Sequence, residues 1–353
     1  MSYTSGMKAI RVHEHGDYDV LKIEDIPVPE PGPGKVRIKV AWSALNHLDT
    51  WVRRGVPGHK FPLPMTPGCD FSGVVDTIGD GVEGWKEGDR VAVAPGHACG
   101  QCRRCGEGKQ NLCHRYGIYG EHEDGGNAEY AVVEAANLMA VPDGFGLDLA
   151  AAFPLAYLTA WHMLTTRCGV QPGDKVLIHA AGSGVSVAAT QIAKLHGARV
   201  FVTAGSDEKV ERGIQNGAEA GVNYRENDWV PAVKEWAGRG GLDIIVDHVG
   251  ADTLPKGLWL LARGGRIVTC GVTSGAQMEL NMAPLFFKTL SVLGSTMGGL
   301  GEQKHVADLV FSGALQPIID SRFELEQVAD AHRRMGEREV FGKILLQVNP
   351  GLA

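Results

Sequence analysis

The chain has 353 residues, enough for two domains and a sizeable core. Its net charge of −7 is spread without a basic tract, and its 48 glycines follow no G-X-Y period, so nucleic-acid-binding, collagen-like and disordered classes are excluded. The most apolar stretch, 149–164, is too short for a bilayer, and no signal peptide is visible at the N-terminus. We therefore expect a cytoplasmic protein with no membrane partner.

The first 150 residues or so read as short strands separated by turns. Alternating or β-branched residues predict strands at 36–45, 71–78, 90–94 and 128–133. Turns rich in glycine, proline and aspartate lie between them, as at 29–34. This pattern predicts an antiparallel barrel or sandwich.

Four of the seven cysteines are clustered, at Cys99, Cys102, Cys105 and Cys113. Four thiolates at such spacings can close a tetrahedral shell around Zn²⁺, and a cytosolic chain favours metal over disulfides. An iron–sulfur cluster could use the same thiolates, but nothing else in the chain suggests electron relay. We therefore predict one structural zinc in a lobe over residues 95–115, with no open position for substrate.

After Pro154 short apolar strands alternate with helices, which predicts a parallel, doubly wound sheet. Helices are expected at 186–196 and 207–216. The six expected strands are 175–180, 199–203, 221–224, 243–247, 266–270 and 290–294. Two more helices, at 303–312 and 325–335, and two strands, near 318 and at 343–348, complete the chain.

A Gly-rich turn separates the first of these strands from the first helix. Small residues there let the backbone approach a pyrophosphate, whose charge is met by the N–H groups of the helix N-terminus. An ordinary connecting loop is the alternative, but the place of the turn at the start of a six-strand alternation favours a dinucleotide site. The cofactor-binding residues predicted in the turn are Gly182, Ser183, Gly184 and Val185.

The next strand indicates which nucleotide is bound. It ends near Ser206 with no acid at its tip, where NAD-binding folds usually hold the ribose 2′-OH. Lys209 and Arg212 follow, and Tyr224 ends the third strand. Ser206, Lys209 and Tyr224 are therefore predicted beside a 2′-phosphate, which favours NADPH over NADH, unless the two cations only solvate their helix. Backbone groups after later strands are expected to border the nicotinamide, at Gly271, Val272 and Ser295.

These features together resemble the zinc-type medium-chain dehydrogenase/reductase family over essentially the whole chain. The matching motifs are Asn46-His47-Leu48-Asp49, Pro67-Gly68-Cys69-Asp70, Gly73-Val74-Val75, the cysteine lobe, Ala128-Glu129-Tyr130 and the Gly-rich turn. The resemblance implies an α/β protein with a GroES-like β-barrel domain (1–157 and 298–353) and a Rossmann doubly wound parallel sheet domain (158–297). It also implies a homodimer or homotetramer, in which strand 290–294 pairs across a two-fold axis.

The departures from the family pattern concern the catalytic metal. Alcohol dehydrogenases of the family hold a zinc at positions that match Asn46, Cys69 and Leu155. Only Cys69 is a good ligand here, although Asp70 stands beside it, and a catalytic zinc needs about three protein ligands. The chain resembles instead the zinc-independent quinone oxidoreductase branch. Ser186 also replaces the last glycine of the Gly-rich turn, and we expect this to alter packing rather than abolish binding.

Without a catalytic metal, we expect hydride transfer to a quinone or an activated C=C bond, because these acceptors delocalise the incoming charge onto an oxygen. Asn46 is predicted to polarise that oxygen through its side-chain amide. Asp49 is predicted to orient the site or relay a proton, with Tyr157 as a second candidate. The resemblance places His47 at the cofactor pyrophosphate.

Structural alternatives stand beside these roles. Asn46 could simply cap a turn, Asp49 could pair with Arg53 or Arg54, and Tyr157 could be pocket wall. Two other functions are possible for the whole protein, and in each of them its binding partner is a small molecule. One is a zinc-dependent alcohol dehydrogenase or aldehyde reductase with an unusual ligand set that includes Cys69 and Asp70. The other is a non-catalytic protein that binds NADPH as a sensor or structural partner.

Overall fold

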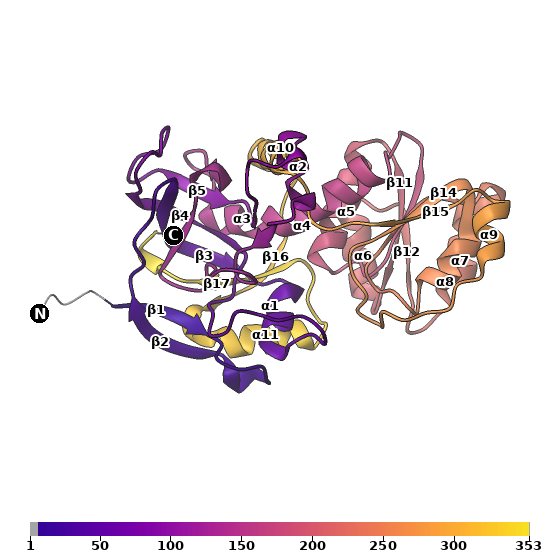
Figure 1. The fold of residues 1–353 in the computed structure, drawn as a ribbon. Helices are drawn as coiled ribbons and strands as arrows, with labels where there is room; N and C mark the ends of the chain where they lie inside the picture. The colour runs from indigo at the N-terminus through magenta and orange to yellow at the C-terminus, as the bar shows by residue number, and fades with distance from the viewer. Residues whose placement is uncertain (1–5, 353) are drawn as a thin grey trace, which may run out of the picture. The chain divides into compact units, whose positions relative to one another are not determined.

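A computed structural model describes residues 6–352 of the chain. The chain divides into two compact units (Figure 1). The first unit consists of Met1–Leu155 and Gly299–Ala353, and the second is Ala156–Gly298. The sequence prediction divided the chain at 157 and 297.

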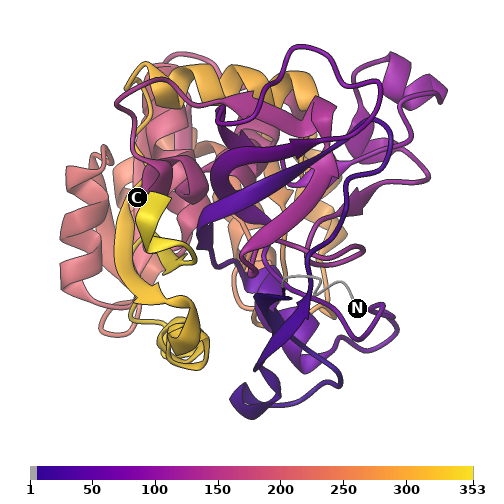
Figure 2. The ribbon, with the colours of Figure 1, turned by 90° about the vertical axis from the view of Figure 1, so that its left-hand side faces the viewer.

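The first unit is built on a seven-stranded sheet in the order β16-β17-β3-β4-β5-β9, with β8 paired to β3. All neighbours are antiparallel except β16 and β17. Figure 2 shows the yellow C-terminal strands beside the N-terminal ones, because β17 pairs with β3. The strands are β3 (Lys35–Ala44), β4 (Asp70–Ile78), β5 (Arg90–Val93), β8 (Tyr130–Glu134), β9 (Leu138–Ala140), β16 (Ile319–Glu324) and β17 (Lys343–Gln347).

Smaller elements complete the first unit. Two strand pairs, β1 (Gly6–Arg11) with β2 (Lys22–Pro27) and β6 (Gly96–His97) with β7 (Gly117–Ile118), lie outside the main sheet. Its helices are α1 (His47–Arg54), α2 (Arg103–Gly106), α3 (Leu147–Ala152), α10 (Leu300–Phe311) and α11 (Val328–Gly336), and α4 (Pro154–Trp161) spans the division between the units.

The core of the first unit follows from the two-residue period of its strands. Val36, Ile38 and Val40 on β3 are fully buried, while the residues between them reach solvent in part. They pack with other apolar side chains of the sheet, such as Phe71 and Val91. This alternation is the pattern that predicted the strand, so the predicted β-rich domain is confirmed.

The second unit is a six-stranded parallel sheet in the order β12-β11-β10-β13-β14-β15. Figure 1 shows α5 and α6 on one face and α7 and α8 on the other. The strands are β10 (Lys175–Ile178), β11 (Arg199–Ala204), β12 (Ala220–Asn223), β13 (Leu242–Asp247), β14 (Leu261–Thr269) and β15 (Ser291–Gly294). The helices are α5 (Gly184–Leu195), α6 (Asp207–Gln215), α7 (Trp229–Ala237), α8 (Leu254–Leu260) and α9 (Met282–Phe287). The predicted doubly wound sheet is confirmed, and its order reverses beside β10, where such sheets bind ligands.

Local backbone geometry explains where the predicted boundaries were wrong. The first parallel strand ends at Ile178 rather than at 180, because Ala180 has a left-handed φ of 53° that turns the chain into the Gly-rich turn. Helix α5 then begins at Gly184 rather than at Ser186. Helix α1 was not predicted at all, since its eight residues are short for a periodic signal.

Within residues 6–352, no helix has both the length and the apolarity to cross a membrane.

Candidate functional site

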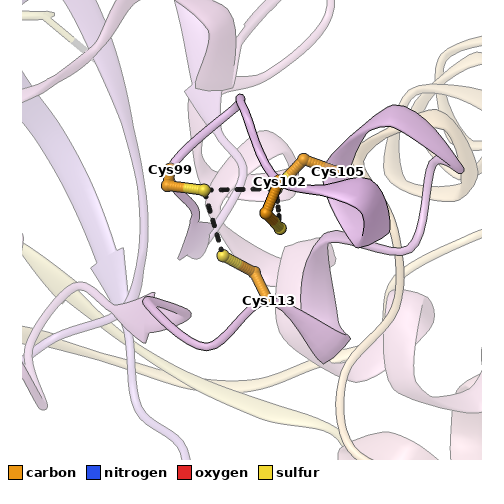
Figure 3. A group of neighbouring side chains, drawn as sticks. All are labelled: Cys99, Cys102, Cys105 and Cys113. Atoms are coloured by element: carbon orange, nitrogen blue, oxygen red, sulfur yellow. Dashed lines mark hydrogen bonds between the residues drawn. The ribbon is translucent and has the colours of Figure 1, made fainter.

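The four clustered cysteines of the first unit point their sulfur atoms toward one another (Figure 3). All four Sγ atoms lie within 4.8 Å of one another. The separations are 3.5 Å for Cys99–Cys113, 3.5 Å for Cys102–Cys105 and 3.9 Å for Cys99–Cys105. Zinc–sulfur bonds of about 2.3 Å in a tetrahedron set the sulfurs about 3.8 Å apart. The donor set therefore fits one structural Zn²⁺.

Backbone N–H groups lower the pKa of Cys99 and Cys102, whereas burial raises the pKa of Cys105 to about 12. N–H groups of Gln101 and Cys102 point to Cys99 and lower the pKa of its thiol to about 6. Thiolates are the form that binds zinc. The seven cysteines of the chain, which all lie in the described range, are free thiols, so no disulfide competes for this group.

A second polar centre lies where three neighbouring strands of the same unit meet. Ala44 of β3 pairs with both Asp70 of β4 and Leu345 of β17. This register brings Asn46, which follows β3, next to Asp70 and Lys343, the first residues of β4 and β17. We call Asn46, Cys69, Asp70 and Lys343 the lysine centre.

Lys343 is the middle of this centre. Its ammonium donates to Asn46 Oδ1 at 2.6 Å and to Asp70 Oδ2 at 2.9 Å. The side chain of Lys343 is only 5% exposed and that of Asp70 is fully buried. A buried charge is tolerated when it is paired and hydrogen-bonded in this way. Sequence reasoning missed Lys343, and the signal that could have found it is a lysine that opens an otherwise apolar strand.

The lysine centre does not fit a catalytic zinc. The amide nitrogen of Asn46 donates to Cys69 Sγ at 3.2 Å and to Asp70 Oδ2 at 2.9 Å. Burial raises the pKa of the Cys69 thiol well above its ordinary value, so it is not a ready thiolate. The other Asp70 oxygen accepts the backbone N–H of Leu155 at 2.8 Å. The Asp70 carboxylate, which would have to bind the metal, is thus already paired with the Lys343 ammonium.

Asp49 joins the lysine centre to the backbone around it. Its Oδ2 accepts the N–H of Asn46 at 2.7 Å, and its Oδ1 accepts the N–H of Gly68 at 2.9 Å. The residue is 1% exposed, and burial raises its pKa to about 6. Arg53, one of its predicted alternative partners, lies instead over the ring of Tyr18 at 4.0 Å.

The other residues predicted for the chemistry are placed as follows. His47 is exposed at the first turn of α1, in the first unit. Tyr157 belongs to the second unit, where its hydroxyl donates to Gln191 Oε1 at 3.2 Å. Burial raises the pKa of the Tyr157 phenol far above its ordinary range. The structure thus brings Asn46 and Asp49 together within one unit and describes Tyr157 within the other.

In the second unit, the Gly-rich turn of Gly182, Ser183, Gly184 and Val185 connects β10 to α5. Ser183 is the residue before the helix, so the first N–H groups of α5 lie in the turn without helical partners. The turn sits beside the point where the strand order reverses. A helix N-terminus at such a position fits the pyrophosphate of a dinucleotide.

Polar groups gather at the end of β11, where Ser206 caps α6 by accepting the N–H of Lys209 at 3.3 Å. A β-carbon on Gly205 would lie 3.0 Å from the Tyr224 hydroxyl and 3.3 Å from Arg225 Nε. Ser206, Lys209 and Tyr224 therefore have a neighbouring guanidinium that sequence reasoning missed. Arg225 directly follows Tyr224, and its position after the third strand was the available signal.

The later strands end in residues predicted to border the nicotinamide. Gly271 and Val272 follow β14, and Val272 is 44% exposed. Ser295 follows β15, and its backbone N–H donates to Thr269 O at 2.9 Å. The buried hydroxyl of Ser295 has no hydrogen-bond partner among the residues that the structure describes. These positions lie at the carboxyl edge of the sheet, as the Gly-rich turn does.

Comparisons with known proteins agree with both units. Residues 32–143 match the family described as alcohol dehydrogenase GroES-like domain, and residues 184–312 match zinc-binding dehydrogenase. Quinone oxidoreductase of Homo sapiens is 33% identical over 336 residues, which cover 93% of this chain and 94% of the relative.

Solved structures give the same answer. A structure titled NAD-dependent alcohol dehydrogenase is 48% identical with a TM-score of 0.93, covering 97% of this chain and all of the other. A cobalt- and zinc-bound alcohol dehydrogenase from Pyrobaculum aerophilum is 33% identical with a TM-score of 0.88, covering 97% of this chain and 99% of the other. The chain therefore belongs to the zinc-type medium-chain dehydrogenase/reductase family and is an NAD(P)H-dependent oxidoreductase.

Proposed function

We propose that the protein is an NADPH-dependent reductase of quinones or of activated C=C bonds, and that it works without a catalytic zinc. The observation that carries this proposal is the lysine centre, where an ammonium is paired with the carboxylate beside Cys69. A fixed organic cation can stabilise the oxygen anion of a quinone or an enone, whose negative charge is already delocalised.

In this mechanism a bound nicotinamide supplies the hydride. Lys343 uses two of its three N–H groups on Asn46 and Asp70, and the third has no partner among the described residues. We assign that N–H and the positive charge to the oxygen on which charge develops. Because Asn46 and Asp70 hold the Lys343 ammonium in place before the reaction, the site need not reorganise when negative charge develops on the substrate oxygen.

Asn46 acts in this mechanism by holding Lys343. We predicted that its amide N–H groups would polarise the substrate, but they donate to Asp70 and Cys69, while its oxygen accepts from the ammonium. Asp49, with a pKa raised to about 6, is a suitable group to hold or release a proton near neutral pH. Tyr157 remains a second candidate for the proton donor.

The test combines metal analysis with turnover. We expect one zinc per chain, and steady NADPH consumption with phenanthrenequinone or with a simple enone that continues after a chelator is added to the assay. Two zincs per chain with chelator-sensitive alcohol oxidation would instead support the zinc-dependent dehydrogenase. Two of the similar structures are described as alcohol dehydrogenases. Inertness toward a panel of quinones, enones and alcohols would indicate a non-catalytic NADPH-binding protein.

The preference for NADPH is supported by the groups around Gly205. Lys209, Tyr224 and Arg225 offer two cations and a hydroxyl to a 2′-phosphate, and the acid after Ser206, Asp207, accepts from Asn223 at 3.2 Å. Lys209→Ala should raise KM for NADPH much more than KM for NADH. Lys234→Ala, on the opposite face of the sheet, is the matched control. Equal effects on both cofactors would remove Lys209 from the site.

We also propose a homodimer or a homotetramer formed through the free edge of the six-stranded sheet. The edge strand β15 exposes 40% of Val292, and nearby α9 exposes 66% of both Phe286 and Phe287. Exposed apolar side chains beside an open strand edge favour association. Light scattering should give a dimer or tetramer, and Val292→Lys should shift it to monomer.

The absence of a basic tract supports a small molecule as substrate and no nucleic-acid partner, and we place the protein in the cytoplasm.

A further inference from the structure

Ser186 of α5 lies against a histidine from the turn that follows β13 in the second unit. The Oγ atom of Ser186 is 2.9 Å from Nε2 of His248, which directly follows β13. The same hydroxyl donates to the backbone oxygen of His179 at 2.7 Å. Ser186 is fully buried.

A serine hydroxyl has one hydrogen, and His179 O, a carbonyl oxygen, can only accept it. We assign that hydrogen to His179 O, so that Oγ accepts from Nε2–H of His248. Burial lowers the pKa of His248, which keeps the ring neutral near pH 7.

His248 also holds a third segment through its backbone. Its carbonyl oxygen accepts from the Thr273 backbone N–H at 3.3 Å and from the Thr273 hydroxyl at 3.2 Å. A β-carbon on Gly271 would lie 3.2 Å from the same oxygen. The neighbouring Asp247 accepts the N–H groups of Val249 and Gly250, so the segment after β13 is itself well held. His248 thus joins the turns that follow β10, β13 and β14.

These three turns form the carboxyl edge of the sheet on both sides of the strand-order reversal, where the nicotinamide cofactor binds in this fold. We propose that Ser186 and His248 form a positioning pair that holds the Gly-rich turn in the conformation that accepts the cofactor pyrophosphate. The pair acts on the turn and does not itself touch the cofactor. A glycine at 186 could not make this contact, so the link depends on the serine side chain. A turn already held in its binding conformation loses less freedom when the nucleotide binds.

The test measures nucleotide affinity without any substrate, so that it does not depend on the proposed reaction. Dissociation constants for NADPH and NADH are measured by fluorescence or calorimetry, together with the Tm of each variant. Ser186→Ala, Ser186→Gly and His248→Leu should each raise both constants about fivefold, the factor of one lost hydrogen bond of ~1 kcal/mol. The NADPH-to-NADH ratio should not change, because both nucleotides share the pyrophosphate. The double variant Ser186→Ala with His248→Leu should bind the nucleotides no more weakly than either single variant, because both changes remove the same hydrogen bond.

Two controls separate positioning from general stability. His248→Gln keeps a nitrogen donor at the ε position and should bring affinity back to within twofold of the wild type. Thr190→Ala removes another buried hydroxyl of α5, which donates to Ser186 O at 2.9 Å without reaching β13, and should change only Tm. An unchanged affinity in His248→Leu would overturn the proposal. So would a fivefold loss in Thr190→Ala, or a wild-type protein that binds neither nucleotide.

Discussion

The cysteine lobe and the lysine centre belong to the same unit, yet they differ in whether the protein itself supplies a positive charge to the acidic groups. In the lobe, four thiols face one another. In the lysine centre, one thiol and one carboxylate face an ammonium that the chain itself supplies. The first group fits a divalent ion that would complete it, whereas the charge of the Asp70 carboxylate is already balanced by the Lys343 ammonium. The difference teaches that donor atoms alone do not identify a metal site, because the charge already present must be counted as well.

The lobe gives the largest expected effect. Cys102→Ser should remove the single zinc per chain and lower Tm strongly, because structural zinc in small peptides is bound with an apparent free energy of about 10–16 kcal/mol. Zinc content by mass spectrometry and a thermal melt check both results. Cys168→Ala, at a buried cysteine of the second unit, should keep its zinc. Zinc retained in Cys102→Ser would place the metal elsewhere.

The lysine centre gives the next effect. Lys343→Met leaves the Asp70 carboxylate buried without its cation, so the free energy of unfolding should fall by about 3–5 kcal/mol. The same variant should lower kcat on the order of 100-fold if the ammonium stabilises the developing charge. Denaturant unfolding and NADPH consumption with a quinone measure the two quantities.

Paired variants separate stability from chemistry in this prediction. Lys343→Met combined with Asp70→Asn removes both charges and should recover most of the stability but not kcat. Lys8→Met breaks an ion pair with Glu326 whose side chains are half exposed, and should leave the free energy of unfolding nearly unchanged. A double variant that recovered kcat would show that the ammonium has no role in the reaction.

Asp49 should make stability near the lysine centre depend on pH. Its pKa is about 6 in the folded protein, above the unfolded value of 3.8, so the folded state holds a proton that the unfolded state has lost between these values. Stability from this group is thus complete below about pH 4 and is lost as pH rises through about 6, by up to about 3 kcal/mol. Thermal melts from pH 4 to pH 7 should show the wild type falling relative to Asp49→Asn. Parallel curves of Tm against pH for the two proteins would contradict a raised pKa of Asp49.

The smallest effect is expected at Asn46. Asn46→Ala leaves the ammonium paired with Asp70 but removes one of its two acceptors, so kcat should fall about tenfold, or ~1.4 kcal/mol. Cofactor affinity should be nearly unchanged. Asn349→Ala removes an asparagine that donates to Val40 O in the same unit, and should leave kcat as it is. An unchanged kcat in Asn46→Ala would remove the residue from the mechanism.

The sequence predicted those features of the molecule that rest on local pattern. The alternation of Val36, Ile38 and Val40 and the apolar runs of the parallel strands place the sheets to within a few residues. The spacing of the four cysteines likewise lies within one short segment. Helix α1 was missed because its eight residues give few turns for a periodic signal.

The lysine centre could not be predicted because its members meet only through sheet register. Lys343 lies 297 residues after Asn46, and no pattern in either segment refers to the other. The role of Asn46 depends on which partners its amide finds, and those come from β4 and β17. Arg225 was missed for a similar reason, since only the packing of β12 beside β11 brings it to Gly205.

The division of the first unit into two chain segments also orders the events of synthesis. The N-terminal segment supplies Asn46 and Asp70, and the second unit is complete at residue 298, before the strand that carries Lys343 has been made. Because domains fold as units while the chain is being synthesised, the nucleotide-binding half can form while the other half still lacks its last strands. A chain truncated before residue 343 would keep the cysteines and the Gly-rich turn but leave a buried carboxylate without its cation. Only a chain synthesised beyond β17 therefore assembles the lysine centre.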